Sequence, residues 1–252
     1  MFDSHAHLND EQFQDDLADV LQRAKAAGVQ GIINIGYDLE SSRRAVQLAE
    51  QNEALYAVIG VHPHDAKTME AEVRSQLEML GQHPKVVAVG ETGLDYYYDH
   101  SPRETQKSVF KEHFDLARQL NKPVVIHSRD AAADTFAIVE ENSDVRCVLH
   151  CYSGSLEMAE KYLELGHVIS FAGPITFKNA SRLRSVAAGV PMERTLIETD
   201  CPYLAPVPYR GQRNEPSYVP KVAEQLAELH GITVEEVHRT TAANTRHFFA
   251  IE

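Results

Sequence analysis

The sequence predicts an α/β fold in which eight parallel strands, each followed by a helix, close into a (β/α)8 TIM barrel. Apolar, β-branched runs of four to seven residues recur along the 252-residue chain, and most are separated by stretches with helical spacing. Strands that are apolar almost throughout are typical of a parallel sheet covered by helices. Polar side chains at the strand ends, described below, favour the closed barrel over an open sheet.

The expected strands are short and regularly spaced. No G-x-G-x-x-G motif follows the first of them, which argues against a dinucleotide-binding open sheet. Barrels of 200–250 residues often form one domain, so residues 1–252 are expected to be a single domain. The eight strands are expected at residues 2–6, 31–36, 56–61, 85–90, 123–127, 145–150, 167–170 and 194–198.

Helix signals fill the segments between the strands. Asn9 or Asp10 is expected to cap the first helix, and Gly28 is expected to close it. The segments 101–104 and 233–236 both have the spacing of a capping box. The long irregular stretch 201–216, with four prolines, follows the eighth strand, and long loops in compact domains are usually functional. The apolar stripe of the first helix consists of Phe13, Leu17, Val20, Leu21 and Ala24.

Composition and charge narrow the class of protein. The chain is 43% hydrophobic and 24% charged, which is typical of a globular protein, and it has no apolar run long enough to span a membrane. The N-terminus lacks a signal-peptide pattern, and the three cysteines include no C-x-x-C pair, so a reducing, cytoplasmic location is expected. The net charge of −13 argues against a broad basic surface for duplex nucleic acid.

Histidines and carboxylates gather at the predicted carboxyl ends of the strands. Side chains two residues apart lie on the same face of a strand, as two ligands of one metal would. In an α/β barrel these strand ends converge, and the first strand lies beside the eighth only if the sheet closes. The strand ends contribute His5, His7, His62, His64, Glu91, His127, His150, Glu198 and Asp200.

Four imidazoles and two carboxylates are too many ligands for one tetrahedral ion with an open position, so they suit two divalent ions. Two ions about 3.5–4 Å apart would activate a water and stabilise the attacking and leaving oxygens. Glu91 is expected to bridge the ions, and Asp200 is expected to be both ligand and general base. Such donors suit zinc, manganese, cobalt or nickel, and the carboxylates also admit magnesium. The predicted ligands are His5, His7, Glu91, His127, His150 and Asp200.

Several of these positions have alternative interpretations. Any one histidine, taken singly, is more often a hydrogen-bonded structural residue than a ligand. His62 and His64 are expected to contact substrate or phosphate, the alternative being a loop packed on Pro63. Asp3 either orients a ligand histidine or bonds a backbone amide. Cys151 and Cys201 adjoin ligands but are expected to be small packing residues.

Several motifs together resemble the TatD family of metal-dependent hydrolases. They are "FDSHAHL", "GVHPH", "VGETGLDYY", "VVIHSRDA", "LHCYSGS", "SFAGPITFKN", "LIETDCPYLAP" and "RGQRNEPSYV", and they run in order from Phe2 to about Phe248. The resemblance implies an amidohydrolase-like (β/α)8 barrel with a divalent-metal centre formed by the same six residues. It also implies deoxyribonuclease activity, often of the 3′–5′ exonuclease type. Glu91 stands where many barrel amidohydrolases have a carboxylated lysine.

A few cationic and aromatic residues are candidates for contact with a phosphodiester. The tyrosines at 96–98 could stack on unpaired bases, the alternative being packing beneath their loop. For Arg210 and Arg213 the alternative is solvated loop charge paired with Glu215. A few cations on an acidic protein fit a single-stranded end or a nucleotide better than a long duplex. The predicted substrate contacts are His62, His64, Arg129, Lys178, Arg210 and Arg213.

The expected function is therefore hydrolysis of phosphodiester bonds in DNA or nucleotides, with Asp200 and Glu91 catalytic and two divalent ions (Mg, Mn or Zn) as cofactors. The alternative enzyme class is an amidohydrolase acting on a small-molecule amide or ester. A non-catalytic metal-binding protein is disfavoured, because the ligand set and a candidate base are both intact. No membrane partner is expected.

Overall fold

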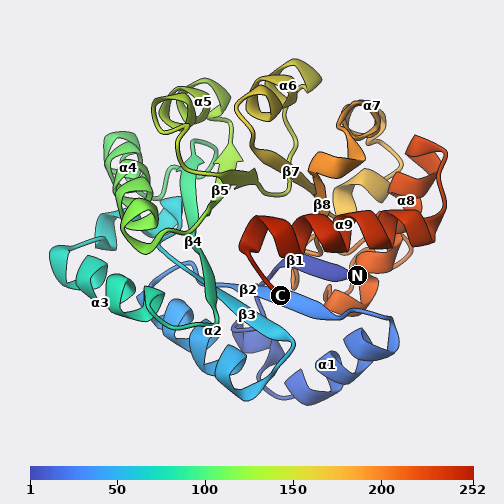
Figure 1. The fold of residues 1–252 in the computed structure, drawn as a ribbon, viewed down its shortest axis with the longest axis horizontal. Coiled ribbons are helices and arrows are strands. Elements are labelled where there is room, and N and C mark those ends of the chain that lie inside the picture. The colour runs from blue at the N-terminus through green and yellow to red at the C-terminus, as the bar shows by residue number, and fades with distance from the viewer. The chain divides into compact units, whose positions relative to one another are not determined.

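The strands follow chain order in one sheet. The computed structural model describes all 252 residues and places eight strands in the hydrogen-bonded order β1 to β8 (Figure 1). The registered pairs β3–β4, β4–β5, β5–β6 and β7–β8 are parallel. All eight predicted strands are present, at β1 Phe2–Ala6, β2 Gly31–Ile35, β3 Leu55–Ile59, β4 Val86–Asp95, β5 Val124–Arg129, β6 Cys147–Leu149, β7 Val168–Phe171 and β8 Thr195–Ile197.

The first strand lies beside the last. The Asp200 amide donates to the His5 carbonyl over 2.9 Å, and the His7 amide donates to the Cys201 carbonyl over 2.8 Å. Ala6 and Cys201 form a parallel bridge beyond the end of β8. Because β1 pairs with the chain that leaves β8, the sheet has no free edge there, and the predicted (β/α)8 barrel is confirmed.

One helix follows each of the first seven strands and two follow β8. Short 3₁₀ helices lie in several connections, namely η1 Glu11–Phe13, η2 Pro63–Thr68, η3 Gly173–Thr176, η4 Met192–Arg194 and η5 Pro216–Tyr218. The α-helices are α1 Leu17–Ala26, α2 Leu39–Gln51, α3 Ala71–Gly81, α4 Arg103–Leu120, α5 Ala132–Glu141, α6 Leu156–Glu164, α7 Ser181–Gly189, α8 Val219–His230 and α9 Val234–Phe249.

The helix starts agree only in part with the sequence signals. Asp10 caps η1, accepting from the Gln12 amide, so the predicted first helix is split and α1 begins later. The capping box of Thr233 and Glu236 is confirmed at the start of α9. The capping box predicted at 101–104 is wrong, because Ser101 is not the N-cap and its hydroxyl donates to the His64 carbonyl over 2.7 Å.

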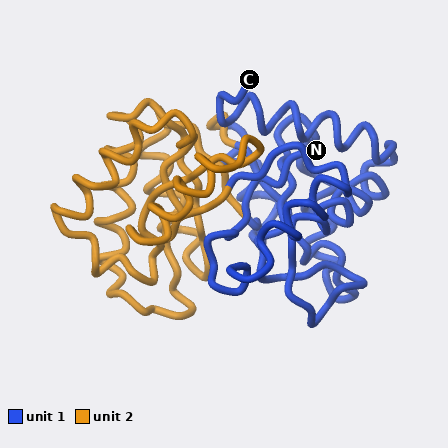
Figure 2. Tube along the Cα trace, turned by 90° about the horizontal axis from the view of Figure 1, so that it is seen from below, with its two compact units in different colours: residues 1–33, 151–164, 168–252 blue, residues 34–150, 165–167 orange.

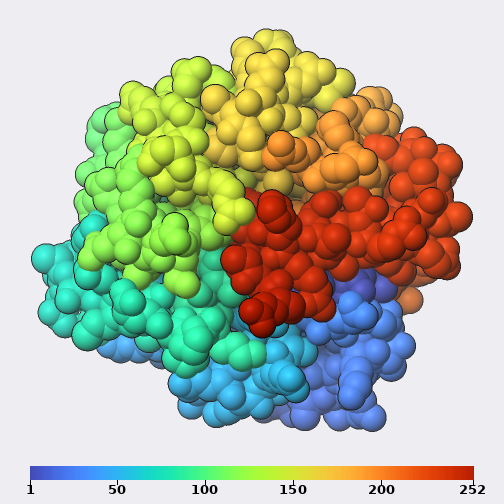
Figure 3. Space-filling view, viewed as in Figure 1, coloured from blue at the N-terminus to red at the C-terminus, as the bar shows by residue number.

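Two compact units make up the chain (Figure 2). Unit 1 comprises residues 1–33, 151–164 and 168–252, and unit 2 comprises residues 34–150 and 165–167. In unit 1, α9 packs against β1 and β8 (Figure 1), and its outer side is at the surface, in red in Figure 3. No helix combines the length and apolarity that a membrane span requires. That residues 1–252 act as a single domain stays a prediction.

Strand β4 in unit 2 is longer than the sequence pattern predicts. It runs ten residues to Asp95, although the apolar run ends at Gly90, and its register against β5 shifts between Val89 and Thr92. Gly93 has φ +136°, and a Cβ there would lie 2.0 Å from the His127 carbonyl oxygen. Only glycine allows β4 and β5 to approach this closely, and the continued strand places Glu91 within β4 and Asp95 at its end.

Candidate functional site

Three predicted ligands converge in unit 1 and are named here the first donor group: His5, His7 and Asp200. The Nε2 atoms of His5 and His7 lie 3.2 Å apart. Oδ1 of Asp200 lies 3.6 Å from Nε2 of His5 and 3.4 Å from Nε2 of His7. The sequence prediction that β1 brings both imidazoles to one side, and that closure brings Asp200 to them, agrees with these distances.

The buried side chain of Asp3 supports the first donor group by hydrogen bonds to neighbouring groups. Buried Asp3 accepts from the His5 amide over 3.3 Å, the Thr199 amide over 2.9 Å and the Thr199 hydroxyl over 2.5 Å. Asp3 was expected either to orient a ligand histidine or to bond a backbone amide, and the structure shows it bonding backbone amides. Burial raises the pKa of Asp3 to about 7, with the charge of Glu198 adding to the effect against the hydrogen bonds from Thr199 and His5.

Three further predicted ligands converge in unit 2 and form the second donor group: Glu91, His127 and His150. Oε1 of Glu91 lies 3.2 Å from Nδ1 of His127 and 2.8 Å from Nε2 of His150. Nε2 of His150 lies 3.4 Å from Nδ1 of His127. The three residues come from β4, the middle of β5 and the position directly after β6.

The spacing within each group fits a divalent metal. Two atoms bound to one ion at about 2.1 Å lie roughly 3.4 Å apart when the geometry is tetrahedral. The closest donor-atom separations are 3.2, 3.4 and 3.6 Å in the first group and 2.8, 3.2 and 3.4 Å in the second. Imidazole nitrogens with a carboxylate are a donor set for zinc, manganese and related ions. Each group can therefore supply three ligands and leave a position open.

His62 lies beside the second donor group with its tautomer set by the backbone. Its Nδ1 accepts from the His64 amide over 3.2 Å, so neutral His62 carries its hydrogen on Nε2, 3.7 Å from Oε1 of Glu91. Burial lowers the pKa of His62 well below its ordinary value, against the opposing charge of Glu91. His62 is therefore a neutral hydrogen-bond donor at Nε2.

Asp95, which the sequence analysis did not select, joins His64 to the second donor group. Its Oδ2 lies 3.0 Å from Nε2 of His64 and 3.1 Å from Nε2 of His127. Burial opposes ionisation of Asp95, but the hydrogen bonds from His127, the Tyr98 amide and His64 outweigh it and hold its pKa below the ordinary value. Burial likewise lowers the pKa of His127, while the bonds to Asp95 and Glu91 raise it, and the net shift is upward.

The signal that could have found Asp95 is present in the sequence. It stands in "VGETGLDYYY", four residues after Glu91. A carboxylate that follows an apolar run needs a partner if it is buried. Asp200 was predicted from its position at a strand end, whereas Asp95 is 1% exposed and has the partners that a buried carboxylate needs.

The cations predicted to contact substrate lie on both units. The guanidinium of Arg129 lies 4.0 Å from the ring centre of Tyr97, in unit 2. In unit 1, Lys178 is exposed, and the guanidinium of Arg210 lies 3.7 Å from the ring centre of Phe177. Their contact with substrate stays a prediction.

Arg213 has a different partner from the one considered in the sequence. It forms a bidentate pair with Asp16, at 2.9 and 2.7 Å, whereas Glu215 pairs with Arg23 over 2.6 Å. The pairing of Arg213 with Glu215 was therefore wrong. The Arg213 side chain as a whole is 28% exposed, and its guanidinium also donates to the Gln12 carbonyl.

Of the three consecutive tyrosines at 96–98, one is packed and two are exposed. Tyr96 donates to Asp134 over 2.6 Å, whereas Tyr97 is 58% and Tyr98 is 48% exposed. Tyr98 stacks on His100 with an interplanar angle of 16°. Two of the three tyrosines are therefore exposed at the surface of unit 2, with Arg129 lying over both rings.

The other residues considered near the predicted ligands, Glu198 and the cysteines, make contacts that support the fold. Glu198 is buried and accepts from the Ser170 hydroxyl over 2.6 Å and from the Cys151 amide over 2.6 Å. The three cysteines form no disulfide, and burial raises the pKa of the Cys201 thiol well above its ordinary value. A protonated, buried thiol is a packing residue, as predicted for Cys201.

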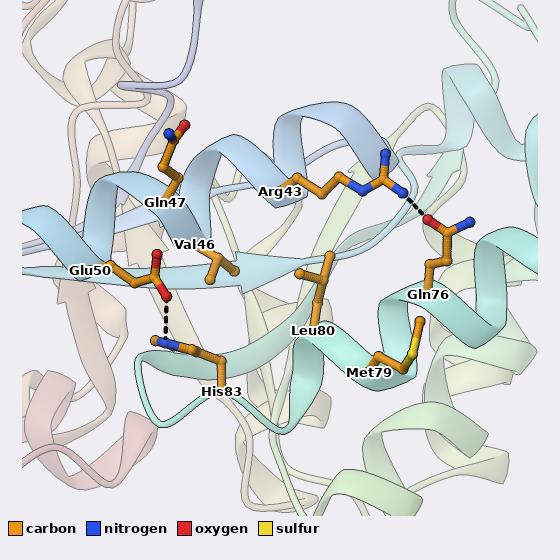
Figure 4. A pocket seen from close by; sticks show the side chains of 8 residues that line it. All are labelled: Arg43, Val46, Gln47, Glu50, Gln76, Met79, Leu80 and His83. Carbon is orange, nitrogen blue, oxygen red and sulfur yellow. Dashed lines mark hydrogen bonds and ion pairs between the residues drawn. The ribbon is translucent and has the colours of Figure 1, made fainter.

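Unit 2 also has a hollow on its surface. Side chains of α2 and α3 line it, with His83 just beyond α3, and Glu50 pairs with His83 there over 3.1 Å (Figure 4). Met79 on its rim is 66% exposed. None of the predicted ligands or substrate contacts lines this hollow.

The fold and the two donor groups together are those of a metal-dependent hydrolase, and the comparisons with known proteins agree. The family model described as TatD related DNase matches residues 2–250. The chain is 46% identical to the uncharacterized metal-dependent hydrolase YabD of Bacillus subtilis, covering 100% of this chain and 99% of that protein.

A second relative and a solved structure extend the comparison. The chain is 34% identical to the 3′-5′ ssDNA/RNA exonuclease TatD of Klebsiella pneumoniae, covering 100% of this chain and 98% of that protein. The crystal structure of YJJV, a TatD homolog from Escherichia coli, superposes with a TM-score of 0.95 at 33% identity, covering 100% and 98% of the two chains. The chain belongs to the TatD family of metal-dependent hydrolases.

Proposed function

We propose that this protein hydrolyses phosphodiester bonds at the 3′ ends of single-stranded DNA, using divalent ions held by the two donor groups. The observation that carries the proposal is the spacing of these groups, each with two imidazoles and one carboxylate set for one ion. Ions bound there would supply Lewis acidity toward phosphate oxygens and lower the pKa of a water. The exonuclease name of the Klebsiella pneumoniae relative supports the choice of substrate.

Asp200 is proposed to accept the proton of the attacking water. It belongs to the first donor group, where its Oδ1 lies 3.4 Å from Nε2 of His7, and it is 13% exposed. A carboxylate next to a divalent ion stays ionised at neutral pH, so it can act as a base there. General-base assistance of this kind contributes about 10²–10⁴-fold in rate.

His62 is proposed to donate a hydrogen bond to a substrate oxygen. Its Nε2 carries the hydrogen in the neutral ring, because Nδ1 accepts from the His64 amide. A neutral donor offers a hydrogen bond to a phosphate oxygen without giving up a proton at the reaction pH.

The substrate is proposed to be an unpaired end of DNA. The net charge of −13 disfavours a long duplex, whose affinity depends on many cationic contacts. Arg210 and Arg213 would contact phosphate oxygens, and exposed Tyr97 and Tyr98 would stack on bases. Single-strand binding by stacking needs fewer phosphate contacts.

The test is a metal-by-substrate screen on chelator-stripped protein. The protein is reconstituted with Mg²⁺, Mn²⁺ or Zn²⁺ and given 5′-labelled single-stranded DNA, duplex DNA, RNA, and a panel of amides and esters. We expect a ladder of products shortened from the 3′ end, with single strands cleaved faster than duplexes. An oligonucleotide with a blocked 3′ end is the control and should persist. Hydrolysis of an amide or ester with no cleavage of any nucleic acid would overturn the proposal.

A further inference from the structure

Asp95 of unit 2 is a buried carboxylate with an unusual set of partners. It ends β4 and is 1% exposed. Oδ1 accepts from the Tyr97 amide over 3.1 Å and from the Tyr98 amide over 2.9 Å. Oδ2 faces Nε2 of His64 at 3.0 Å and Nε2 of His127 at 3.1 Å. All four partners lie within donor range of a group that only accepts when ionised.

This arrangement fixes which nitrogen of each ring carries a hydrogen. A carboxylate cannot donate, so His64 and His127 both carry a hydrogen on Nε2. Neutral His127 then has its lone pair on Nδ1, the atom that lies 3.2 Å from Oε1 of Glu91 and 3.4 Å from Nε2 of His150. Nδ1 of His127 is therefore the nitrogen available to an ion in the second donor group.

The backbone of Asp95 is held as firmly as its side chain. Buried Gln106 of α4 accepts from the Asp95 amide over 2.8 Å and donates to the Asp95 carbonyl over 3.2 Å. The same amide nitrogen of Gln106 donates to the Ser101 carbonyl over 2.8 Å. Because the amide and the carbonyl of Asp95 are both hydrogen-bonded, its backbone has little freedom, and the position of Oδ2 is well defined.

We propose that Asp95 is a positioning residue that sets the tautomer and orientation of His127 for metal binding through Nδ1, and that it holds His64 beside it. The proposal rests on the proposed function only in that the second donor group binds a divalent ion. Partners that orient a ligand histidine typically contribute about 10–100-fold to metal affinity. Asp95 would act on the ion through His127, with no contact to it.

Asp95→Asn tests the proposal because only one side of an amide can accept. If the amide oxygen keeps the Tyr97 and Tyr98 amides, its NH₂ faces the two rings and moves their hydrogens to Nδ1. The reverse orientation leaves two backbone amides without an acceptor, which is the less favourable outcome. Nδ1 of His127 would then donate to Glu91 and be closed to an ion.

Zn²⁺ titrated calorimetrically into chelator-stripped protein gives the first readout. We expect Asp95→Asn to weaken one of two binding steps by about 10–100-fold and leave the other unchanged. Asp99→Asn is the matched control, since Asp99 lies in the same loop but pairs with exposed Arg103 over 2.7 Å. Wild-type affinity in both steps for Asp95→Asn would overturn the proposal. Absence of Zn²⁺ binding to the wild type would instead overturn the proposed function.

Nitrogen-15 NMR of the histidine rings gives a second readout, and its first measurement is made on the wild type alone. In the Zn²⁺-loaded wild type we expect His127 to carry its hydrogen on Nε2 and to bind through Nδ1. In Asp95→Asn the hydrogen should move to Nδ1. Coordination of wild-type His127 through Nε2 would overturn the proposal, and this measurement decides the matter if Asp95→Asn does not fold.

Discussion

The two donor groups have matching compositions but different supports. In unit 1, the first donor group is positioned by the pairing of β1 with the chain after β8. Buried Asp3 bonds backbone and hydroxyl groups there. In unit 2, Asp95 bonds the imidazole of His127 directly. The first support is part of the fold itself, whereas the second is a network of side chains.

Because the supports differ, substitutions near the two donor groups should affect different properties of the protein. A change at the β1–β8 pairing alters backbone hydrogen bonds and should affect folding as well as metal binding. A change in the side-chain network of unit 2 should alter metal binding while the strands remain paired. The two groups are therefore expected to respond differently to the same kind of substitution.

The largest expected effect follows from Asp200→Asn in the first group. The substitution keeps the size of the side chain and removes the base, so we expect kcat for phosphodiester cleavage to fall at least about 100-fold. Circular dichroism should show a folded protein, and metal content is measured on the same sample. A variant that keeps its metals and near-wild-type activity would reduce Asp200 to a ligand at most.

Glu91→Gln tests whether the two groups are independent. If Glu91 serves only the second group, bound metal should fall from about two equivalents to about one, because an amide is a weaker ligand than a carboxylate. If Glu91 bridges two ions, both should be weakened. Elemental analysis after reconstitution decides between these outcomes, with exposed Glu104→Gln as control. A stoichiometry of one in the wild type with excess metal would contradict the bridge.

The cations of unit 1 should affect substrate binding more than chemistry. Replacing Arg210 and Arg213 with Ala should raise KM on DNA by at least about tenfold, because about tenfold is expected for the loss of a single charged hydrogen bond. The fall in kcat should be smaller if both serve ground-state binding. Arg182→Ala, which removes an exposed arginine from α7 in the same unit, is the matched control. Unchanged kinetics would exclude both arginines from substrate binding and leave Arg213 as the partner of Asp16.

The smallest expected effect concerns stability and tests the side-chain support of unit 2. Buried His113 accepts from the Val61 amide over 2.9 Å, just before His62, and bonds the Val109 carbonyl over 2.7 Å. Burial lowers the pKa of His113 to about 4, so between about 4 and 6.5 the unfolded chain binds more protons. Stability should therefore fall by about 1–2 kcal/mol as the pH drops from 7 to 5.

Denaturant unfolding in the presence of chelator measures this effect. His113→Gln can keep an acceptor for Val61 and a donor for Val109, but it does not titrate. The variant should lose less stability than the wild type over the same pH interval. An equal loss in both proteins would assign the acid sensitivity to other groups.

The sequence by itself determined the fold class and the predicted ligands. Apolar strands alternating with helical stretches are a local pattern, and the chemistry of His and carboxylate side chains at strand ends is local as well. Both could be read from short segments such as "FDSHAHL" and "LIETDCP". The eight strands and the grouping of Asp200 with His5 and His7 followed from that pattern once closure was assumed.

Only the tertiary structure decided how these side chains are held. Arg213 pairs with Asp16 and Arg23 with Glu215 across more than 190 residues of chain, which no local pattern encodes. The hydroxyl of Ser101 bonds the His64 carbonyl instead of capping α4. Asp95 meets two imidazoles because β4 continues past Gly90 and approaches β5 at Gly93. Partner choice depends on which distant groups packing brings within about 3 Å, and that is settled only when the chain folds.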